Sequence, residues 1–227
     1  MNPHHSPPER VGWFGKIPAL GDFVTRHLPP SFVQPWDEWL SAELSEARLL
    51  LADTWAETYQ HAPTTCFSLS AGVVDERAWQ GILVPSFDRV GRQFPLTVAL
   101  SSAPRTVATR TLQWWAELVT TGRRALEPGC DAQALDEALT AFVSRQAAFM
   151  RHSGTDDERL QRELATLVEG TSAWWPWRSE DRIDPVLSRI AGLPRGAAFR
   201  HLLSTRHDTV NPPQVDDPTF GGIRPIH

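Results

Sequence analysis

The chain has few cysteines, no long apolar segment and no recognisable leader. Two cysteines, Cys66 and Cys130, are too few for a disulfide framework and lack the paired spacing of a zinc site, so we expect buried free thiols. No apolar run approaches the ~20 residues that a membrane span requires. The first ten residues lack the basic start and apolar stretch of a secretory signal. These absences predict a cytoplasmic protein.

Lysine is almost missing. Lys16 is the only lysine, so arginine carries nearly all of the positive charge, and arginine favours bidentate contacts with carboxylates or phosphates and stacking on aromatic rings. The formal net charge is −5 at pH 7. An acidic chain without a basic groove argues against nucleic-acid binding, which depends on lysine and arginine neutralising phosphates.

The sequence contains alternating strand and helix patterns, and its 227 residues are about the length of one domain. Hydrophobic residues make up 41% of the 227 positions, which fits a single α/β domain. Periodicity predicts strands at 11–16, 64–74, 79–85, 94–100 and 171–177, and helices at 31–51, from about 109, from 131, at 156–168, at 184–190 and at 197–203. Ser31 and Asp131 are the expected N-caps.

This order predicts a mixed central β-sheet flanked by helices, a three-layer α/β/α sandwich, because a helix crossover between strands can restore the same strand direction. The domain is expected at 11–205. Residues 1–10 and 206–227 are rich in proline, histidine and glycine, which predicts two mobile tails.

Ten tryptophans are a heavy load of large aromatic residues, and we expect most of them in the core. The adjacent pairs at 114–115 and 174–175 are informative, since neighbours on a helix or strand cannot both face the same core. One member of each pair needs a second surface, either another layer of the domain or a partner.

Two strings combine glycines and prolines with a few charged side chains: GWFGKIPALGDF at 12–23 and PSFDRVGRQFPL at 85–96. Glycine and proline set special backbone angles, and such strings build shaped polar loops on a rigid scaffold. Neither string carries a catalytic motif. The pattern therefore favours a recognition surface over a reaction centre.

Catalytic alternatives are weaker. Gly15-Lys16 is followed by Ile17, not by the serine or threonine of a phosphate-binding loop. Ser86 with Asp88 lacks a nucleophile elbow, and although the scattered histidines leave a hydrolase triad open, we do not expect an enzyme. No histidine or carboxylate spacing suits a metal ion, and no cofactor is expected.

Our site hypothesis is a polar patch for partner recognition, formed by Lys16, Asp22, Arg26, Ser86, Asp88, Arg89 and Arg92. An equally simple alternative is that these side chains buttress the loops through internal bonds. Lys16 would then pair with Asp22, and Asp88 would cap backbone N–H groups or pair with Arg89 or Arg92. A further alternative is a sensor whose arginine-rich loop binds an anion or nucleotide.

Together the two strings resemble the TagF (ImpM-like) accessory proteins of bacterial type VI secretion systems. The resemblance covers roughly 11–205 and is strongest before 105. It rests on Gly12-Trp13-Phe14-Gly15-Lys16-Ile17-Pro18, Gly21-Asp22-Phe23-Val24, Leu28-Pro29, Phe32, Trp36-Asp37, Trp39-Leu40, Trp55, Tyr59, Ala62-Pro63, Phe67, Trp79, Gly81, Pro85-Ser86, Asp88-Arg89, Gly91-Arg92 and Phe94-Pro95-Leu96, with weaker signals at Trp174-Trp175, Gly192-Leu193-Pro194 and Phe199.

The resemblance implies a cytoplasmic, non-enzymatic negative regulator that acts after translation to restrain assembly or firing of the secretion apparatus. In such systems the implied partners are type VI secretion components, among them a forkhead-associated scaffold protein. A functional link to a PppA-type protein phosphatase is also implied, and this chain has no room for a fused phosphatase domain.

Overall fold

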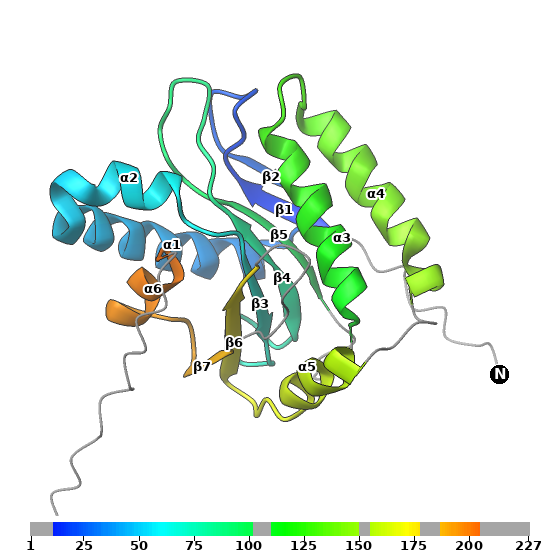
Figure 1. Ribbon diagram of the computed structural model, residues 1–227. Helices are drawn as coiled ribbons and strands as arrows, with labels where there is room; N and C mark the ends of the chain where they lie inside the picture. Colours follow the sequence, from blue (N-terminus) through cyan, green and yellow to red (C-terminus); the bar gives the residue numbers. More distant parts are fainter. Residues whose placement is uncertain (1–10, 102–109, 150–154, 178–186, 205–227) are drawn as a thin grey trace, which may run out of the picture.

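A seven-stranded β-sheet forms the middle layer of the protein (Figure 1), with the strand order β2-β1-β5-β4-β3-β6-β7. The computed structural model describes residues 11–101, 110–149, 155–177 and 187–204. The strands are β1 Gly12–Gly15, β2 Val24–Arg26, β3 Thr65–Leu69, β4 Trp79–Val84, β5 Leu96–Ser101, β6 Thr171–Pro176 and β7 Ser188–Ala191.

Helices cover both faces of this sheet. They are α1 Pro30–Leu51, α2 Trp55–Gln60, α3 Leu112–Arg123, α4 Ala132–Phe149, α5 Thr155–Ala165 and α6 Ala197–Leu202, with short 3₁₀ turns at 52–54 and 124–126. Buried side chains of α1, α2 and α6 share one hydrophobic core with the sheet, and those of α3, α4 and α5 share the other. The predicted α/β sandwich with three layers is confirmed.

The tryptophan pairs show how both cores are filled. Neighbours on a strand point to opposite faces, and Trp174 lies in the core under α1 while Trp175 lies in the core under α3. The expectation of two surfaces is wrong for the helical pair. Trp114 packs against Phe142 of α4 and Trp115 against Trp175 of the sheet, so both are buried in one core that wraps around α3.

Strand direction differs from the prediction of a mixed sheet, because every pairing among the described strands is antiparallel. The central strands β3, β4 and β5 are joined in succession by short connections, which reverse the chain. Through the antiparallel pairings of the strand order, β2 and β3 run in the same direction but are separated by β1, β5 and β4, whereas β5 and β6 run in opposite directions. The helical crossovers therefore place no two parallel strands side by side among the described strands.

Several local predictions also change. The helix expected at 184–190 is wrong in its described part, because strand β7 occupies Ser188–Ala191. Ser31 does not cap α1, because the N-cap is Pro29. The hydroxyl of Ser31 donates instead to the carboxylate of Asp75 at 3.0 Å. Asp131 does cap α4, since its Oδ1 accepts the N–H groups of Gln133 and Ala134. Strand β2 and helix α2 were not predicted.

The cysteine prediction is confirmed for one residue. Cys66 is a fully buried free thiol, and burial raises its pKa well above the usual value. Cys130 is also free but only half-buried. The tails predicted at 1–10 and 206–227 lie outside the described residues.

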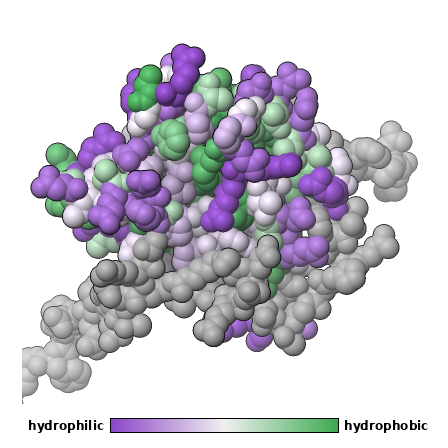
Figure 2. Space-filling view, turned by 45° about the horizontal axis from the view of Figure 1, so that its top comes forward, coloured by the Kyte–Doolittle hydropathy of each residue, from purple (hydrophilic) through white to green (hydrophobic). Residues whose placement is uncertain are grey.

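Two connections project from one end of the sheet (Figure 1): residues 16–23 between β1 and β2, and residues 85–95 between β4 and β5. Because β1 pairs with β5, the two connections are brought together. Figure 2 looks onto this end of the molecule, where hydrophobic groups (green) are visible between strongly hydrophilic ones (purple). Both strings singled out in the sequence lie here.

Candidate functional site

Residues 86–94 form a tight hairpin. The N–H of Phe94 donates to the carbonyl of Ser86 at 3.1 Å, that of Asp88 to Arg92 at 3.1 Å, and that of Gly91 to Asp88 at 2.8 Å. Gly91 has φ 84°, a left-handed conformation that suits glycine at the third position of a three-residue hairpin loop. This geometry puts Arg89 and Val90 at the tip.

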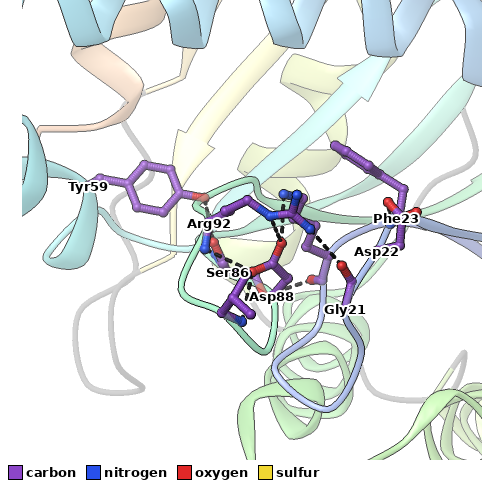
Figure 3. Close-up of polar contacts among 9 residues, drawn as sticks. Gly21, Asp22, Phe23, Tyr59, Ser86, Asp88 and Arg92 are labelled. Carbon is purple, nitrogen blue, oxygen red and sulfur yellow. Dashed lines mark hydrogen bonds and ion pairs between the residues drawn. The ribbon is translucent and has the colours of Figure 1, made fainter.

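The carboxylate of Asp88 lies inside the hairpin and holds it in shape (Figure 3). Its Oδ1 accepts the N–H groups of Val90 at 3.1 Å and Arg92 at 2.9 Å. Its Oδ2 accepts Nζ of Lys16 at 3.0 Å and Nε of Arg92 at 2.6 Å. Asp88 has no exposed surface, and four donors take the place of water around its two oxygens.

These donors decide the protonation state of Asp88. Burial by itself raises the pKa of a carboxyl group. Here the N–H of Arg92, the ammonium of Lys16, the side chain of Arg92 and the N–H of Val90 together outweigh burial and hold the pKa of Asp88 well below its usual range. Asp88 is therefore ionised, and it neutralises one of the two cations beside it.

The base of the hairpin is tied to the rest of the domain. Oγ of Ser86 donates to the carbonyl of Lys16 at 2.7 Å. The hydroxyl of Tyr59 on α2 donates to the carbonyl of Ser86 at 3.0 Å and accepts the N–H of Ser86 at 3.2 Å. Burial raises the pKa of Tyr59 well above its usual value, so this hydroxyl keeps its proton. Nε1 of Trp55 donates to the side chain of Gln93 at 2.6 Å.

The connection between β1 and β2 packs along the hairpin. Nη2 of Arg92 donates to the carbonyl of Gly21 at 2.7 Å (Figure 3). The N–H of Arg89 donates to the carbonyl of Leu20 at 2.8 Å. At Gly15 the two connections approach so closely that an added Cβ would lie 2.2 Å from the carbonyl oxygen of Pro95. Only glycine fits there, and its φ of 133° also disfavours other residues.

The outward side of this end has a different character. Phe23 is 43% exposed, Phe87 46% and Val90 71%, and they are three of seven large hydrophobic residues exposed in the described part of the chain. The rings of Phe23 and Phe94 meet edge to face, with 4.7 Å between their centroids. The exposed guanidinium of Arg89 makes no hydrogen bond or ion pair to any described residue. We call Asp22, Phe23, Phe87, Arg89 and Val90 the tip surface.

The structure divides the predicted site residues into three groups. Lys16, Ser86, Asp88 and Arg92 form the internal network. Asp22 and Arg89 face solvent on the tip surface, and Lys16 pairs with Asp88, not with Asp22 as predicted.

Arg26 does not join the others. Its Nε lies 3.9 Å from Oδ2 of Asp136 on α4, whose other oxygen accepts Nε1 of Trp13 at 2.6 Å. This cluster attaches the edge of the sheet to α4 and is separate from the hairpin.

The polar groups of the Asp88 network bond to one another and hold the hairpin in shape. The Ser86 hydroxyl is buried and donates its proton to a main-chain carbonyl, and Lys16 and Arg92 both contact the Asp88 carboxylate. Among the described residues, no group of three histidine, cysteine or acidic side chains could hold a metal ion. In the same part of the chain, no helix is long and apolar enough to cross a membrane.

Sequence reasoning missed Phe23, Tyr59, Phe87, Val90 and Gln93 as part of this site. A signal was present for the tip. In Asp88-Arg89-Val90-Gly91-Arg92, glycine at the third loop position is typical of a three-residue hairpin, and it would have put residues 89 and 90 at the apex. No short-range signal links Tyr59 or Trp55 to a hairpin some thirty residues away.

Comparison with known proteins finds a family whose matched region contains both connections. The family model described as "TagF N-terminal domain, Type VI secretion system-associated" matches residues 12–142, which include both strings. The chain belongs to the TagF family. Its structure is similar to the crystal structure of PA0076 from Pseudomonas aeruginosa PAO1, with a TM-score of 0.67, 30% sequence identity, and coverage of 94% of this chain and 100% of that one. The TagF chain matches none of the curated proteins.

Proposed function

We propose that this TagF chain is a cytoplasmic, non-enzymatic negative regulator of a type VI secretion system, which acts after translation by binding a component of the apparatus. Membership of a secretion-associated family supports the setting. The observation that supports binding is the hairpin itself, which is held rigidly from inside. Together with the neighbouring connection it displays three exposed hydrophobic residues and an arginine whose side chain is unpaired within the described part of the chain.

Rigidity favours recognition. A partner that binds a loop already held in one conformation does not lose free energy in ordering it. The Asp88 network and the bonds from Tyr59 and Trp55 fix the hairpin before any partner arrives. Arginine and aromatic residues are also the types that contribute most to binding energy in protein interfaces.

The internal network argues against the other two functions considered from the sequence. An anion sensor needs several converging cations that are free to bind, but Lys16 and Arg92 are already neutralised in part by Asp88, which leaves Arg89 alone among the described cations of the two connections. A hydrolase needs an activated nucleophile, but the hydroxyl of Ser86 is bonded to a carbonyl oxygen, which is no base for it. Protein binding is left as the function that the geometry supports best.

The partner we propose first is the forkhead-associated scaffold protein of the secretion system, with a functional link to a PppA-type phosphatase in the same regulation. Nucleic acid is a poor partner for a chain of net charge −5.

The proposal is tested by overproducing the chain in bacteria with an active type VI system and measuring secreted substrates in the medium by immunoblotting. We expect secretion to fall while the cellular amounts of the apparatus components stay constant, because the regulation is post-translational. Purification of the tagged chain from the same cells should retain the scaffold protein. Unchanged secretion in cells that contain the folded chain contradicts the proposed function.

A further inference from the structure

We infer that the tip surface binds a protein surface in which carboxylates lie beside bulky apolar side chains. This inference rests on the proposed function, because it names the chemistry of the partner that the regulator would recognise. It is carried by the charges and the exposed side chains of the two connections.

The net charge of the two connections is opposite in sign to that of the whole chain. Lys16, Arg89 and Arg92 stand against Asp22 and Asp88, a surplus of positive charge on a protein whose net charge is −5. The surplus is directed outward. Arg92 remains 60% exposed although it is paired with Asp88. The Arg89 side chain is exposed and has no ion-pair partner among the described residues, and its planar guanidinium suits a carboxylate.

Apolar surface accompanies the charge. Val90 is 71% exposed at the apex, and Phe87 and Phe23 are each a little under half exposed on the flanks. The ring of Phe23 is held in place, since it lies against Phe14 and Phe94 and beneath the ammonium of Lys16. A partner that gained only salt contacts would leave these groups in water, so apolar side chains on the partner are expected beside its carboxylates.

The outward side chains can be exchanged without disturbing the hairpin. The main-chain groups of residues 89–91 make its bonds, and the side chains of Arg89 and Val90 take no part in them. Val168 offers a matched control, because it is 66% exposed in the connection between α5 and β6, at the opposite end of the molecule from the hairpin (Figure 1).

The test is photo-crosslinking in cells with an active type VI system. The full chain carries p-benzoylphenylalanine at position 90, or at position 168 as the control, and the crosslinked peptide of the other protein is sequenced by mass spectrometry. We expect an adduct from position 90 alone, on a stretch that contains both acidic and large apolar residues. Adding Arg89→Glu should lower its yield about tenfold, and replacing the partner's carboxylates by arginine should restore it.

Three results would overturn the inference. One is an adduct on a basic or purely neutral surface, another is an adduct that survives Arg89→Glu unchanged, and the third is no adduct beyond that of position 168. If the unlabelled chain still represses secretion in the same cells, each of these results removes the inference and leaves the proposed function intact. Loss of repression itself points to failure of the proposed function.

Discussion

The inner and outer sides of the 86–94 hairpin are built on opposite principles. Inside, one carboxylate receives four hydrogen bonds and a tyrosine hydroxyl bonds both main-chain groups of Ser86. Outside, the side chain of Arg89 has no hydrogen-bond or ion-pair partner within the described chain, and Val90 is 71% exposed. The difference teaches that the charged residues of a motif need not share one role, since some of them build the loop and others are displayed by it.

The largest effect is expected from removing the charge at the centre of the inner side. Asp88→Asn leaves the buried ammonium of Lys16 without its carboxylate, which is costly in a site closed to water. We expect the melting temperature to fall by roughly 10 °C, measured by calorimetry. Asp22→Asn is the matched control, because Asp22 is exposed and, among the described residues, accepts only the N–H of Phe23. Equal melting temperatures for the two variants would contradict the assignment.

The same carboxylate predicts how the inner side responds to acid. The pKa of Asp88 lies below its ordinary value of 3.8, so its stabilising contribution is complete above about pH 5. As the pH falls below the ordinary value, the unfolded chain takes up a proton that native Asp88 does not, and the free energy of unfolding decreases. The stability difference between wild type and Asp88→Asn should shrink between about pH 5 and pH 2 in urea titrations. A constant difference over that range would show that folding does not lower the pKa of Asp88, and would contradict the assignment.

A smaller effect is expected where α2 contacts the base of the hairpin. Tyr59→Phe removes the acceptor of the Ser86 N–H, whereas the carbonyl of Ser86 keeps the N–H of Phe94. One buried donor without a partner should lower the free energy of unfolding by about 1–2 kcal/mol in urea titrations. Ser45→Ala, which removes an exposed hydroxyl bonded to a helix carbonyl, should change it far less. A loss of the same size in both variants would show that Tyr59 does not hold the hairpin.

The smallest effect on folding is expected on the outer side. Arg89→Glu and Val90→Asp, alone or together, should change the free energy of unfolding by no more than about 0.5 kcal/mol, because neither side chain takes part in the hairpin. The same double variant should abolish repression of secretion, while Val168→Asp should leave both stability and repression unchanged. A large loss of stability in the double variant would show that the side chains of Arg89 and Val90 also help to hold the hairpin.

The sequence predicts those parts of the fold that depend on interactions between residues close together in the chain. Alternation and helical spacing predict β1, β4, β5, β6 and α1 well, since each pattern is local. Strand direction depends on which strands meet across the sheet, which a periodicity does not contain. The three residues of β2 are too few to give a pattern at all.

The candidate site shows the same division. The two strings were found because glycine, proline and charge are concentrated within each of them. The predicted ion pair between Lys16 and Asp22 was wrong. The partner of Lys16 is Asp88, which is 72 positions away in the chain, whereas Asp22 is only six positions away. The exposed phenylalanines were missed because their fractional burial is decided by packing between the two connections.

Gly91 and the buried carboxylate of Asp88 set the shape of the turn without using the side chains of the two residues at its apex. The apex is thereby released from selection for folding. A duplicated gene could change residues 89 and 90 at once and keep a well-folded product throughout, so new specificities can arise in this lineage through a couple of substitutions and without an unstable intermediate.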